Sequence, residues 1–567
     1  PTRSVHGLPI IEHAEFGRNV PDETVPDADK MELGKIYHMG REEKANLILN
    51  RQAMASHTFV TGSTGTGKSN AVYHLLDEIT KDGRTSFLVV EPAKGEYKNV
   101  FGSRADVKVF GTNPRETPLL RINPFAFPQD IHILEHIDRL VEIFNACWPM
   151  YAAMPAVLKD AIERSYQKVG WDLRNSESEK GVFPTFFDLL DILPGVIEES
   201  HYSKDTQSDY VGALCTRVKS LTNGIYGSVF CAEDALSDAE LFDCNVVVDL
   251  SRVGSMETKS LLMGILVMKL QEYRMCGSEM NSRLRHVTVL EEAHNLLRKT
   301  SAEQPQEGAN LQGKSVEMLA NAIAEMRTYG EGFIIADQAP GLLDMSVIRN
   351  TNTKIILRLP DEEDRKLVGK SAALKEAQID ELSKLPLGVA AVYQNEWPEA
   401  VLCKIEAYPM PENAVYHKPS KMPHEINAEF VFGQLAAGKE LEPLSVSEME
   451  QLKRWLKRHE MMLKPEDGRY LEQVFAGGEL DVAKTRKAVF DFFGGISTVV
   501  DYCAAAEKSF TPRKEFLEQL QGQYGLKAAA ADWVLNSVIS MGMSLNPDAK
   551  AVDNLRTNFE QQGGRVL

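Results

Sequence analysis

At residues 62–69 the chain reads Gly62-Ser63-Thr64-Gly65-Thr66-Gly67-Lys68-Ser69, which fits the pattern G-x-x-x-x-G-K-[ST] at every position. The run HTFVT at 57–61 is typical of a short buried strand, and AVYHLL at 71–76 indicates the start of a helix. In that context glycines let backbone N–H groups curl around phosphate oxygens at a helix N-terminus. The alternative is a glycine-rich turn with a chance lysine, which both flanks disfavour. We therefore expect ATP or GTP to bind here.

The residues of this loop have distinct expected roles. Lys68 can reach the β- and γ-phosphates, and Ser69 can ligate Mg²⁺. The expected phosphate-binding residues are Gly62, Ser63, Thr64, Gly65, Thr66, Gly67, Lys68, Ser69 and the adjoining Asn70.

Composition is that of a globular protein. Of the 567 residues, 43% are hydrophobic and 25% charged, which allows one large domain with insertions or two to four domains. Neither a membrane-spanning run nor a signal-peptide pattern is found. The seven cysteines form no C-x-x-C pair, and we expect reduced thiols in a cytoplasmic protein.

The net charge of −18 argues against a broad nucleic-acid-binding exterior. It does not exclude DNA, because a ring-shaped translocase can hide a basic pore inside an acidic shell.

Buried strands and helices alternate along the first 400 residues. Near-continuous apolar runs indicate a parallel sheet that is covered on both faces. A helix rich enough in leucine and isoleucine to be buried is expected at 257–274, and the alternation predicts a doubly wound α/β fold. The strand-like runs are SFLVV at 86–90, NVVVDL at 245–250, HVTVL at 286–290, FIIA at 333–336 and KIILRL at 354–359.

Changes of pattern suggest the domain organisation. We expect an N-terminal segment at 1–50, an ATPase core at 51–410, a linker at 411–440 and an all-helical domain at 441–567. A helical insertion is expected at about 124–243, with helices at 131–147, 153–169, 186–198 and 208–221. The polar run at 301–313 predicts a flexible loop. Breaks between the C-terminal helices are expected at Pro465, 477–478, 494–495 and Pro512.

A pair of acidic residues ends the strand at 286–290. Beside a phosphate loop, Glu291 would hold Mg²⁺ and Glu292 would act as general base on the attacking water. Consecutive residues at a strand end point in opposite directions, so the two carboxylates can serve different tasks. The alternative is a helix that begins with acidic residues.

A third candidate follows the strand at 333–336. The side chain of Gln338 can touch the γ-phosphate and report its presence, although an ordinary glutamine at the end of a strand would look the same.

Taken together, these segments resemble the HerA/FtsK superfamily of hexameric translocases, and HerA-like ATPases most closely. The resemblance covers roughly 35–407 and implies a RecA-like P-loop core. The matching segments are GSTGTGKSNA at 62–71, EPAKGEY at 91–97, RINPF at 121–125, LEEAH at 290–294, MRTYG at 326–330, DQAP at 337–340 and NTNTKIILR at 350–358.

Three departures from the family pattern stand out. Glu291 replaces the more usual Asp and is one methylene longer, so the metal is expected to be held more indirectly. EPAKGEY has Glu91 first and one additional residue before Gly-Glu-Tyr. Only 61 residues precede the phosphate loop, where the family has a β-barrel; the run GKIYH at 34–38 is a candidate for its last strand.

The resemblance implies ATP hydrolysis between the subunits of a hexameric ring. One subunit would supply Lys68, Ser69, Glu291, Glu292 and Gln338. A neighbour would supply an arginine that neutralises transition-state charge. Arg327 is the first candidate and Arg358 the second, although either can be an ordinary salt-bridge arginine. Glu91 would lie near the site and orient a water or an arginine.

The resemblance also implies double-stranded DNA in the central pore, bound mainly through phosphates. Candidate pore residues are Arg298, Lys299, Lys314, Arg217 and Lys219.

Three functions remain open. The leading one is a DNA translocase or helicase that works with a NurA-like nuclease or a sirtuin-like NADase in DNA processing or antiphage defence. The second is an ATP-stabilised hexameric scaffold that activates such a partner. The third, less favoured, is a secretion or conjugation ATPase.

Overall fold

The computed structural model divides into two compact units. The larger comprises Pro1–Glu177 and Phe183–Lys418, and the smaller comprises Ser178–Val182 and Pro419–Leu567. The structure describes residues 13–21, 23–150, 153–178, 181–232, 235–277, 279–300, 311–410, 415–418, 465–475, 481–508, 511–524 and 528–566.

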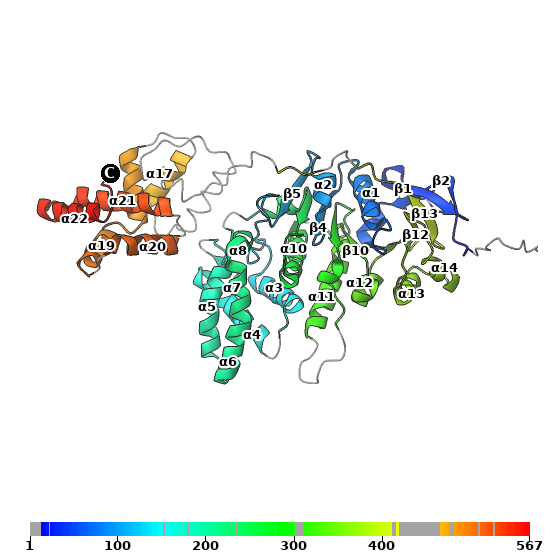
Figure 1. Cartoon of the computed structure of the whole chain (residues 1–567), viewed down its shortest axis with the longest axis horizontal. Helices are drawn as coiled ribbons and strands as arrows, with labels where there is room; N and C mark the ends of the chain where they lie inside the picture. The colour runs from blue at the N-terminus through cyan, green and yellow to red at the C-terminus, as the bar shows by residue number, and fades with distance from the viewer. Residues whose placement is uncertain are drawn as a thin grey trace, which may run out of the picture. The chain divides into compact units, whose positions relative to one another are not determined.

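The larger unit is built on one mixed sheet (Figure 1). In spatial order its strands are β2 (Arg41–Asn50), β1 (Lys30–His38), β13 (Val401–Ile405), β12 (Val389–Gln394), β11 (Thr353–Ile356), β3 (Thr58–Thr61), β10 (Glu331–Asp337), β9 (His286–Glu291), β4 (Ser86–Glu91), β8 (Asn245–Asp249) and β5 (Val107–Gly111). Neighbours from β11 to β5 are parallel, and those from β2 to β11 are antiparallel. Because parallel strands end at one edge, the sheet has a carboxyl edge and an amino edge.

Every strand predicted from the apolar runs is present. The last run was predicted to continue to residue 359, but β11 ends at Ile356. Beyond its end, the Leu357 N–H donates to the Thr61 carbonyl oxygen (2.8 Å) and the Arg358 carbonyl oxygen accepts from the Ser63 N–H (3.0 Å), so this segment runs beside the start of the phosphate loop.

Helices cover both faces of the sheet, because alternate strand residues face opposite sides. Val89 packs in the cluster that holds α1 (Lys68–Thr80) and α2 (Tyr97–Phe101). Its neighbour Val90 packs in the cluster on the other face. That second face is covered by helices that include α3 (Ile133–Cys147), α10 (Met256–Gly277), α11 (Leu311–Glu325) and α12 (Met345–Arg349). The predicted α/β class is confirmed.

The helical insertion lies between β5 and β8. Besides α3 it contains α4 (Met154–Lys168), α5 (Phe186–Glu199), α6 (Lys204–Tyr210), the π-helical η3 (Val211–Cys215), α7 (Thr216–Thr222), α8 (Gly224–Phe230) and α9 (Asp238–Phe242). The single helix predicted at 208–221 is thus three consecutive segments. α5 begins with a capping box in which the Thr185 and Asp188 side chains bind each other's backbone N–H groups.

Shorter elements complete the larger unit. They are η1 (Asp27–Asp29), η2 (Gln52–Ser56), η4 (Ala293–Asn295), η5 (Met326–Tyr329), η6 (Pro340–Leu342), α13 (Glu362–Ser371), α14 (Glu376–Glu381) and the small strand pair β6 (Trp171–Asp172) and β7 (Glu177–Ser178). Of the loop predicted at 301–313, residues 301–310 lie outside the described residues. Residues 311–313 correct the prediction, because they form the first turn of α11.

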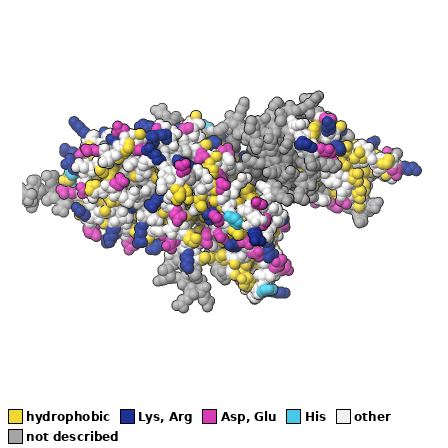
Figure 2. Space-filling view, turned by 180° about the vertical axis from the view of Figure 1, so that it is seen from behind, with side chains coloured by type: hydrophobic (Ala, Val, Ile, Leu, Met, Phe, Trp, Pro, Cys, Tyr) yellow, Lys and Arg dark blue, Asp and Glu magenta, His cyan; other side chains and the backbone are white. Residues whose placement is uncertain are grey.

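The surface is mixed in charge. Acidic and basic side chains are interspersed over the face seen in Figure 2. This agrees with a chain whose 81 Asp and Glu residues outnumber its 63 Lys and Arg residues.

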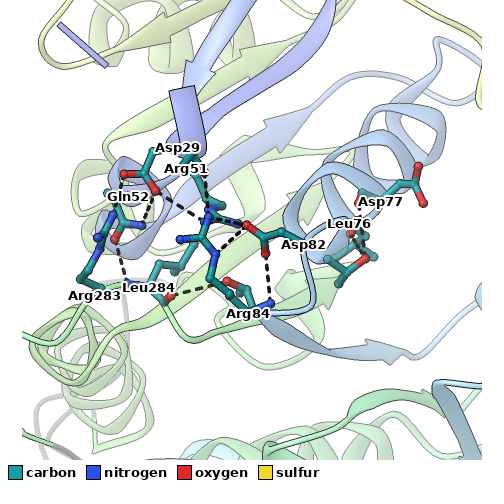
Figure 3. Close-up of polar contacts among 12 residues, drawn as sticks. Asp29, Arg51, Gln52, Leu76, Asp77, Asp82, Arg84, Arg283 and Leu284 are labelled. Atoms are coloured by element: carbon teal, nitrogen blue, oxygen red, sulfur yellow. Dashed lines mark hydrogen bonds and ion pairs between the residues drawn. The ribbon is translucent and has the colours of Figure 1, made fainter. Parts of the chain in front are cut away.

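The N-terminal hairpin extends the central sheet. The strand considered at 34–38 as the end of a β-barrel belongs to β1, which pairs with β2 and β13. An ion-pair cluster centred on the buried Arg51 and Asp29 fastens this hairpin at the amino edge (Figure 3). Arg51 contacts Asp82 at 2.5 Å and Asp29 at 3.5 Å, and Arg283 contacts Asp29 at 2.6 Å.

The smaller unit is helical and has its own apolar core. Its helices are α17 (Pro465–Phe475), α18 (Val482–Phe492), α19 (Ile496–Lys508), α20 (Pro512–Tyr524), α21 (Ala528–Leu545) and α22 (Ala549–Gln561). Pro465 and Pro512 begin helices, as expected where an N–H would be unpaired anyway. Gly494 and Gly495 both have positive φ and separate α18 from α19.

Some predictions about this region lie outside the described residues. They are the linker at 411–440 apart from 415–418, the helical content at 441–464 and the break at 477–478.

Within the described ranges no individual helix combines the length and the apolar composition that a membrane crossing needs. Residues 483–492 and 496–506 reach that threshold only as a pair bent by 67°.

Candidate nucleotide-binding and hydrolytic site

The phosphate loop joins β3 to α1 at the carboxyl edge, in a conformation that needs glycine. Gly65 and Gly67 have φ of 75° and 106°, in the left-handed region that other residues avoid. A Cβ on Gly62 would lie 2.7 Å from both Leu357 Cβ and Thr66 Oγ1. Side chains at these positions would strain the loop or fill its concave side. With glycine there, the concave side stays open and can receive the phosphates of a nucleotide.

Lys68 lies between the two acidic residues at the end of β9. Its Nζ is 3.0 Å from Glu291 Oε2 and 3.3 Å from Glu292 Oε1, and its side chain is only 8% exposed. Burial alone would lower the pKa of Lys68, but the two carboxylates outweigh burial and raise it above the ordinary value. The structure thus brings together the lysine and the carboxylates that the sequence paired.

Both oxygens of Glu291 are held. Oε2 contacts Lys68, and Oε1 accepts a hydrogen bond of 2.5 Å from the fully buried hydroxyl of Tyr97. Ser69 is half-buried in the first turn of α1, next to Lys68 in the chain. Ser69 and Glu291 both offer oxygen atoms, which are the ligand type that Mg²⁺ prefers.

Glu292 has a strained backbone. Its φ of 45° and ψ of 52° lie in the left-handed region, which for a glutamate costs about 1–3 kcal/mol. The backbone N–H and the side-chain amide of Asn295 both donate to the Glu292 carbonyl oxygen, at 2.9 and 2.7 Å. Strain of this kind persists where the surroundings impose it and is typical of functional sites.

Gln338 links Glu292 to the phosphate loop. Its amide Nε2 donates to Glu292 Oε1, and its Oε1 accepts a hydrogen bond of 2.5 Å from Thr64 Oγ1. A side chain that touches both the loop and Glu292 is placed to respond to the terminal phosphate.

His294 and Asp337 lie behind Glu292. Asp337 Oδ2 is 2.9 Å from His294 Nδ1 and accepts a hydrogen bond from the His294 backbone N–H. The hydrogen bond with Asp337 raises the pKa of His294, and the nearby Glu292 acts in the same direction. Glu292, His294 and Asp337 approach one another within 4.8 Å, as metal ligands can. His294 Nδ1 lies 2.9 Å from Asp337 and 3.6 Å from Glu292, so contacts of the imidazole with these two carboxylates are the alternative to a metal site.

Glu91 lies one strand away from this centre. Its carboxylate accepts hydrogen bonds from the backbone N–H groups of Glu96 (2.8 Å) and Tyr97 (3.0 Å). Burial raises the pKa of Glu91 to about 7. Glu91 therefore anchors the loop that carries Tyr97, and its role in orienting a water or an arginine stays a prediction.

Two predicted residues have other contacts. The Asn70 side-chain amide donates to the Glu406 carbonyl oxygen (2.8 Å), and its Oδ1 accepts from the Tyr408 N–H (2.7 Å), so Asn70 ties α1 to the chain after β13. The Arg358 carbonyl oxygen supports Ser63, and its side chain is exposed beside the chain's own phosphate loop.

Arg327 lies at the opposite edge. It belongs to η5, which precedes the seven-residue β10, whereas Gln338 follows β10. At about 3.3 Å per residue the strand separates the two by about 20 Å. The side chain of Arg327 is exposed and cannot reach Lys68 of the same chain.

Sequence reasoning missed Tyr97, Asp337 and His294 as parts of the site. A signal was present, because Tyr97 ends EPAKGEY and Asp337 and His294 follow neighbouring parallel strands. Polar residues at adjacent carboxyl ends meet at one edge.

This fold and this constellation define a P-loop nucleoside triphosphatase with a RecA-like core: a glycine loop, a lysine, paired carboxylates and a polar residue at the end of the neighbouring strand.

Comparisons with known proteins show which proteins this chain resembles. The sequence model of the helicase HerA central domain matches residues 31–234. The DNA double-strand break repair helicase HerA of Sulfolobus acidocaldarius is 25% identical over 395 residues, covering 68% of this chain and 71% of its own length. A probable helicase of Methanocaldococcus jannaschii is 23% identical over 436 residues, covering 70% and 76%. The structure of VirB4 of Thermoanaerobacter pseudethanolicus has the same fold, with a TM-score of 0.51 at 19% identity, over 68% of this chain and 98% of that one.

The chain is therefore similar to HerA-like helicases over its central region, as the motifs predicted.

Proposed function

We propose that this ATPase is a double-stranded DNA translocase or helicase of the HerA type that works as a homo-hexameric ring. The observation that carries the proposal is the contact of Lys68 with Glu291 and Glu292, while Arg327 is exposed at the other edge. The expected lysine, carboxylates and glutamine meet in one chain, and Arg327 of that chain cannot reach them, so a second copy would have to present its Arg327. The relatives named as DNA repair helicases support the DNA-directed part.

The chain's own residues have separate tasks in this proposal. Backbone N–H groups of residues 62–69 and Lys68 would hold the triphosphate of ATP, and Ser69 and Glu291 would hold Mg²⁺. Bound Mg²⁺ supplies charge neutralisation at the phosphates. Glu292 accepts the proton of the attacking water, and Gln338 couples the terminal phosphate to Glu292.

Arg327 is our candidate for the arginine that acts on a neighbour's nucleotide. Its exposure and its distance from the site of its own chain are what a residue acting in trans requires. Arg358 lies beside its own phosphate loop and is better placed to act within its own subunit.

Local basic residues, rather than the whole surface, would contact DNA phosphates. Arg298, Lys299, Lys314 and Lys219 are exposed, which suits that role. Arg217 suits it less, because its guanidinium is 3.5 Å from Glu257 and donates to the Ala213 carbonyl oxygen.

A second candidate is an ATP-stabilised scaffold for a nuclease or an NADase in DNA processing or antiphage defence. The helical unit after residue 465 favours it, because Ile496 and Val500 lie one turn apart on α19 and are 63% and 58% exposed. An exposed apolar pair on a separate unit suits a docking surface for such a partner.

The deciding experiment compares ATP hydrolysis with and without duplex DNA in the native protein and in Glu292→Gln. A translocase is stimulated by DNA and loses both hydrolysis and function in Glu292→Gln. If that variant keeps its activating effect on the partner enzyme, the scaffold function replaces the translocase.

A further inference from the structure

A cavity of about 540 Å³ lies around Arg327 at the amino edge of the sheet. Its walls come from the end of α11, from η5, from the end of α12 and from the residues that flank β11 and β12. The second arginine in these walls is Arg349, the last residue of α12. Two guanidinium groups from separate elements thus share one cavity.

Neither arginine has an acceptor in the described part of the chain. No hydrogen bond or ion pair joins Arg327 or Arg349 to another described residue, and both side chains are exposed. The cavity contains one carboxylate, that of Glu325. Its remaining polar lining is rich in amides that can donate hydrogen bonds, from Asn321, Asn350, Asn352 and Asn395.

The same edge of the sheet shows what paired arginines look like. In the cluster of Figure 3, Arg51 and Arg283 contact Asp29, and Arg84 contacts Asp82. Arginines at this edge therefore have carboxylate partners where their role is to hold the fold. The two in the cavity lack such partners, so the cavity is suited to an anion from outside the chain.

We propose that this cavity receives the terminal phosphates of a nucleotide bound to a neighbouring copy, and that Arg349 acts there beside Arg327. This inference rests on the proposed function and adds a second arginine and a defined receiving site to it. The phosphate loop of the same chain is at the other edge, so only a second copy can bring its nucleotide here.

The shape of the site favours a nucleotide over a nucleic-acid backbone. A volume of about 540 Å³ is within the usual range of about 300–1,000 Å³ for small-molecule sites. A single-stranded or duplex backbone is instead followed by basic residues along a groove or a stripe. The two guanidiniums here line one compact cavity.

The test uses the full chain with Arg349→Gln, Arg349→Lys and, as control, Arg41→Gln, which removes an exposed arginine of β2 outside the cavity. We expect Arg349→Gln to lower kcat for ATP roughly 10- to 100-fold without weakening binding of ATP. Arg349→Lys keeps the charge but not the forked geometry and should recover part of the rate. Arg41→Gln should hydrolyse ATP like the native protein.

Experiments that mix variant subunits distinguish failure of this inference from failure of the proposed function. Arg349→Gln mixed with Glu292→Gln should regain hydrolysis, because the two defects lie on opposite sides of an interface. Native rates in Arg349→Gln, while Arg327→Ala is inactive alone and recovers on mixing, would overturn the role of Arg349 only. Failure of both arginine variants to recover would overturn the action in trans itself. Weaker DNA binding with unchanged hydrolysis would instead assign the cavity to nucleic acid.

Discussion

The carboxyl edge of the central sheet and the Arg327 cavity at its amino edge differ in how completely their charged groups are paired. At the carboxyl edge Lys68, Glu291, Glu292, Gln338 and Thr64 contact one another within a single chain. At the amino edge Arg327 and Arg349 line a cavity, and neither makes a hydrogen bond or an ion pair with another described residue. The charged groups of the carboxyl edge are paired within one copy, whereas the two arginines of the cavity are suited to an anion from outside the chain. We infer that the two edges are complementary halves of one hydrolytic site.

The largest effect is expected at the carboxyl edge. Glu292→Gln keeps the hydrogen-bonding shape but cannot accept a proton, so hydrolysis should fall about 100- to 10,000-fold with ATP still bound. Steady-state ATP hydrolysis measures the fall in rate, and a nucleotide-binding assay measures the retained affinity for ATP. Glu96→Gln is the matched control, because its exposed side chain lies 3.8 Å from Lys94 and outside the contacts of Lys68. Equal losses in both variants would argue against Glu292 as the base.

Gly62→Ala tests the shape of the phosphate loop. The added methyl would lie 2.7 Å from Leu357 Cβ and Thr66 Oγ1, so the loop must shift and nucleotide affinity should drop about 10-fold or more. A fluorescent nucleotide reports the affinity. Gly83→Ala provides the comparison at a surface glycine: the new Cβ meets no atom within 4 Å, although φ of 71° adds local strain. Unchanged affinity in Gly62→Ala would mean that the loop is not the nucleotide cradle.

Tyr97→Phe tests whether Tyr97 positions Glu291 at the carboxyl edge. It removes the hydrogen bond to Glu291 Oε1, and a hydrogen bond to a charged group contributes about 1.5–3 kcal/mol. We expect the Mg²⁺ concentration for half-maximal nucleotide binding to rise roughly 10-fold, with Mg²⁺-free binding unchanged. Tyr166→Phe is the control, since Tyr166 is equally buried but donates to the Phe125 carbonyl oxygen. An identical Mg²⁺ dependence in all three proteins would show that Tyr97 does not position Glu291.

Glu331→Gln should change hydrolysis least and stability most. Burial alone would raise the pKa of Glu331, but His286 and Arg274, at 2.7 and 3.0 Å, hold it below its ordinary value. A lowered folded-state pKa stabilises the fold above the unfolded value of about 4.3, and this stability is lost as pH falls through the folded pKa. The variant should therefore unfold more easily at neutral pH, by about 3–5 kcal/mol.

Denaturant unfolding at several pH values measures this difference. The difference in free energy of unfolding between the native protein and Glu331→Gln should become smaller as the pH is lowered. A difference in unfolding free energy that becomes larger in acid would contradict the role of Glu331 as a stabilising carboxylate.

The carboxyl edge was largely predictable from sequence. Its groups are local in the chain, because Lys68 follows a recognisable glycine run and Glu291 and Glu292 end an apolar strand. Parallel strands then bring these ends together, which is why their contact could be expected before any coordinates.

The remaining parts depend on contacts that no local pattern encodes. The hydroxyl of Tyr97 reaches Glu291 across a sequence separation of 194 residues. Asn70 fits the loop pattern, yet its side chain binds the backbone at Glu406 and Tyr408. The cavity is lined by residues between 56 and 395 in the chain, and only the folded structure shows that its two arginines make no ion pair with other described residues.

The most direct measurement of the central claim mixes Arg327→Ala with Glu292→Gln, each inactive alone, and follows ATP hydrolysis across the mixing ratio. If the edges of two copies form one site, activity should return and peak near an equal ratio, where roughly a quarter of head-to-tail interfaces combine both intact halves. No return of activity at any ratio, in mixtures that assemble like the native protein, would contradict the account.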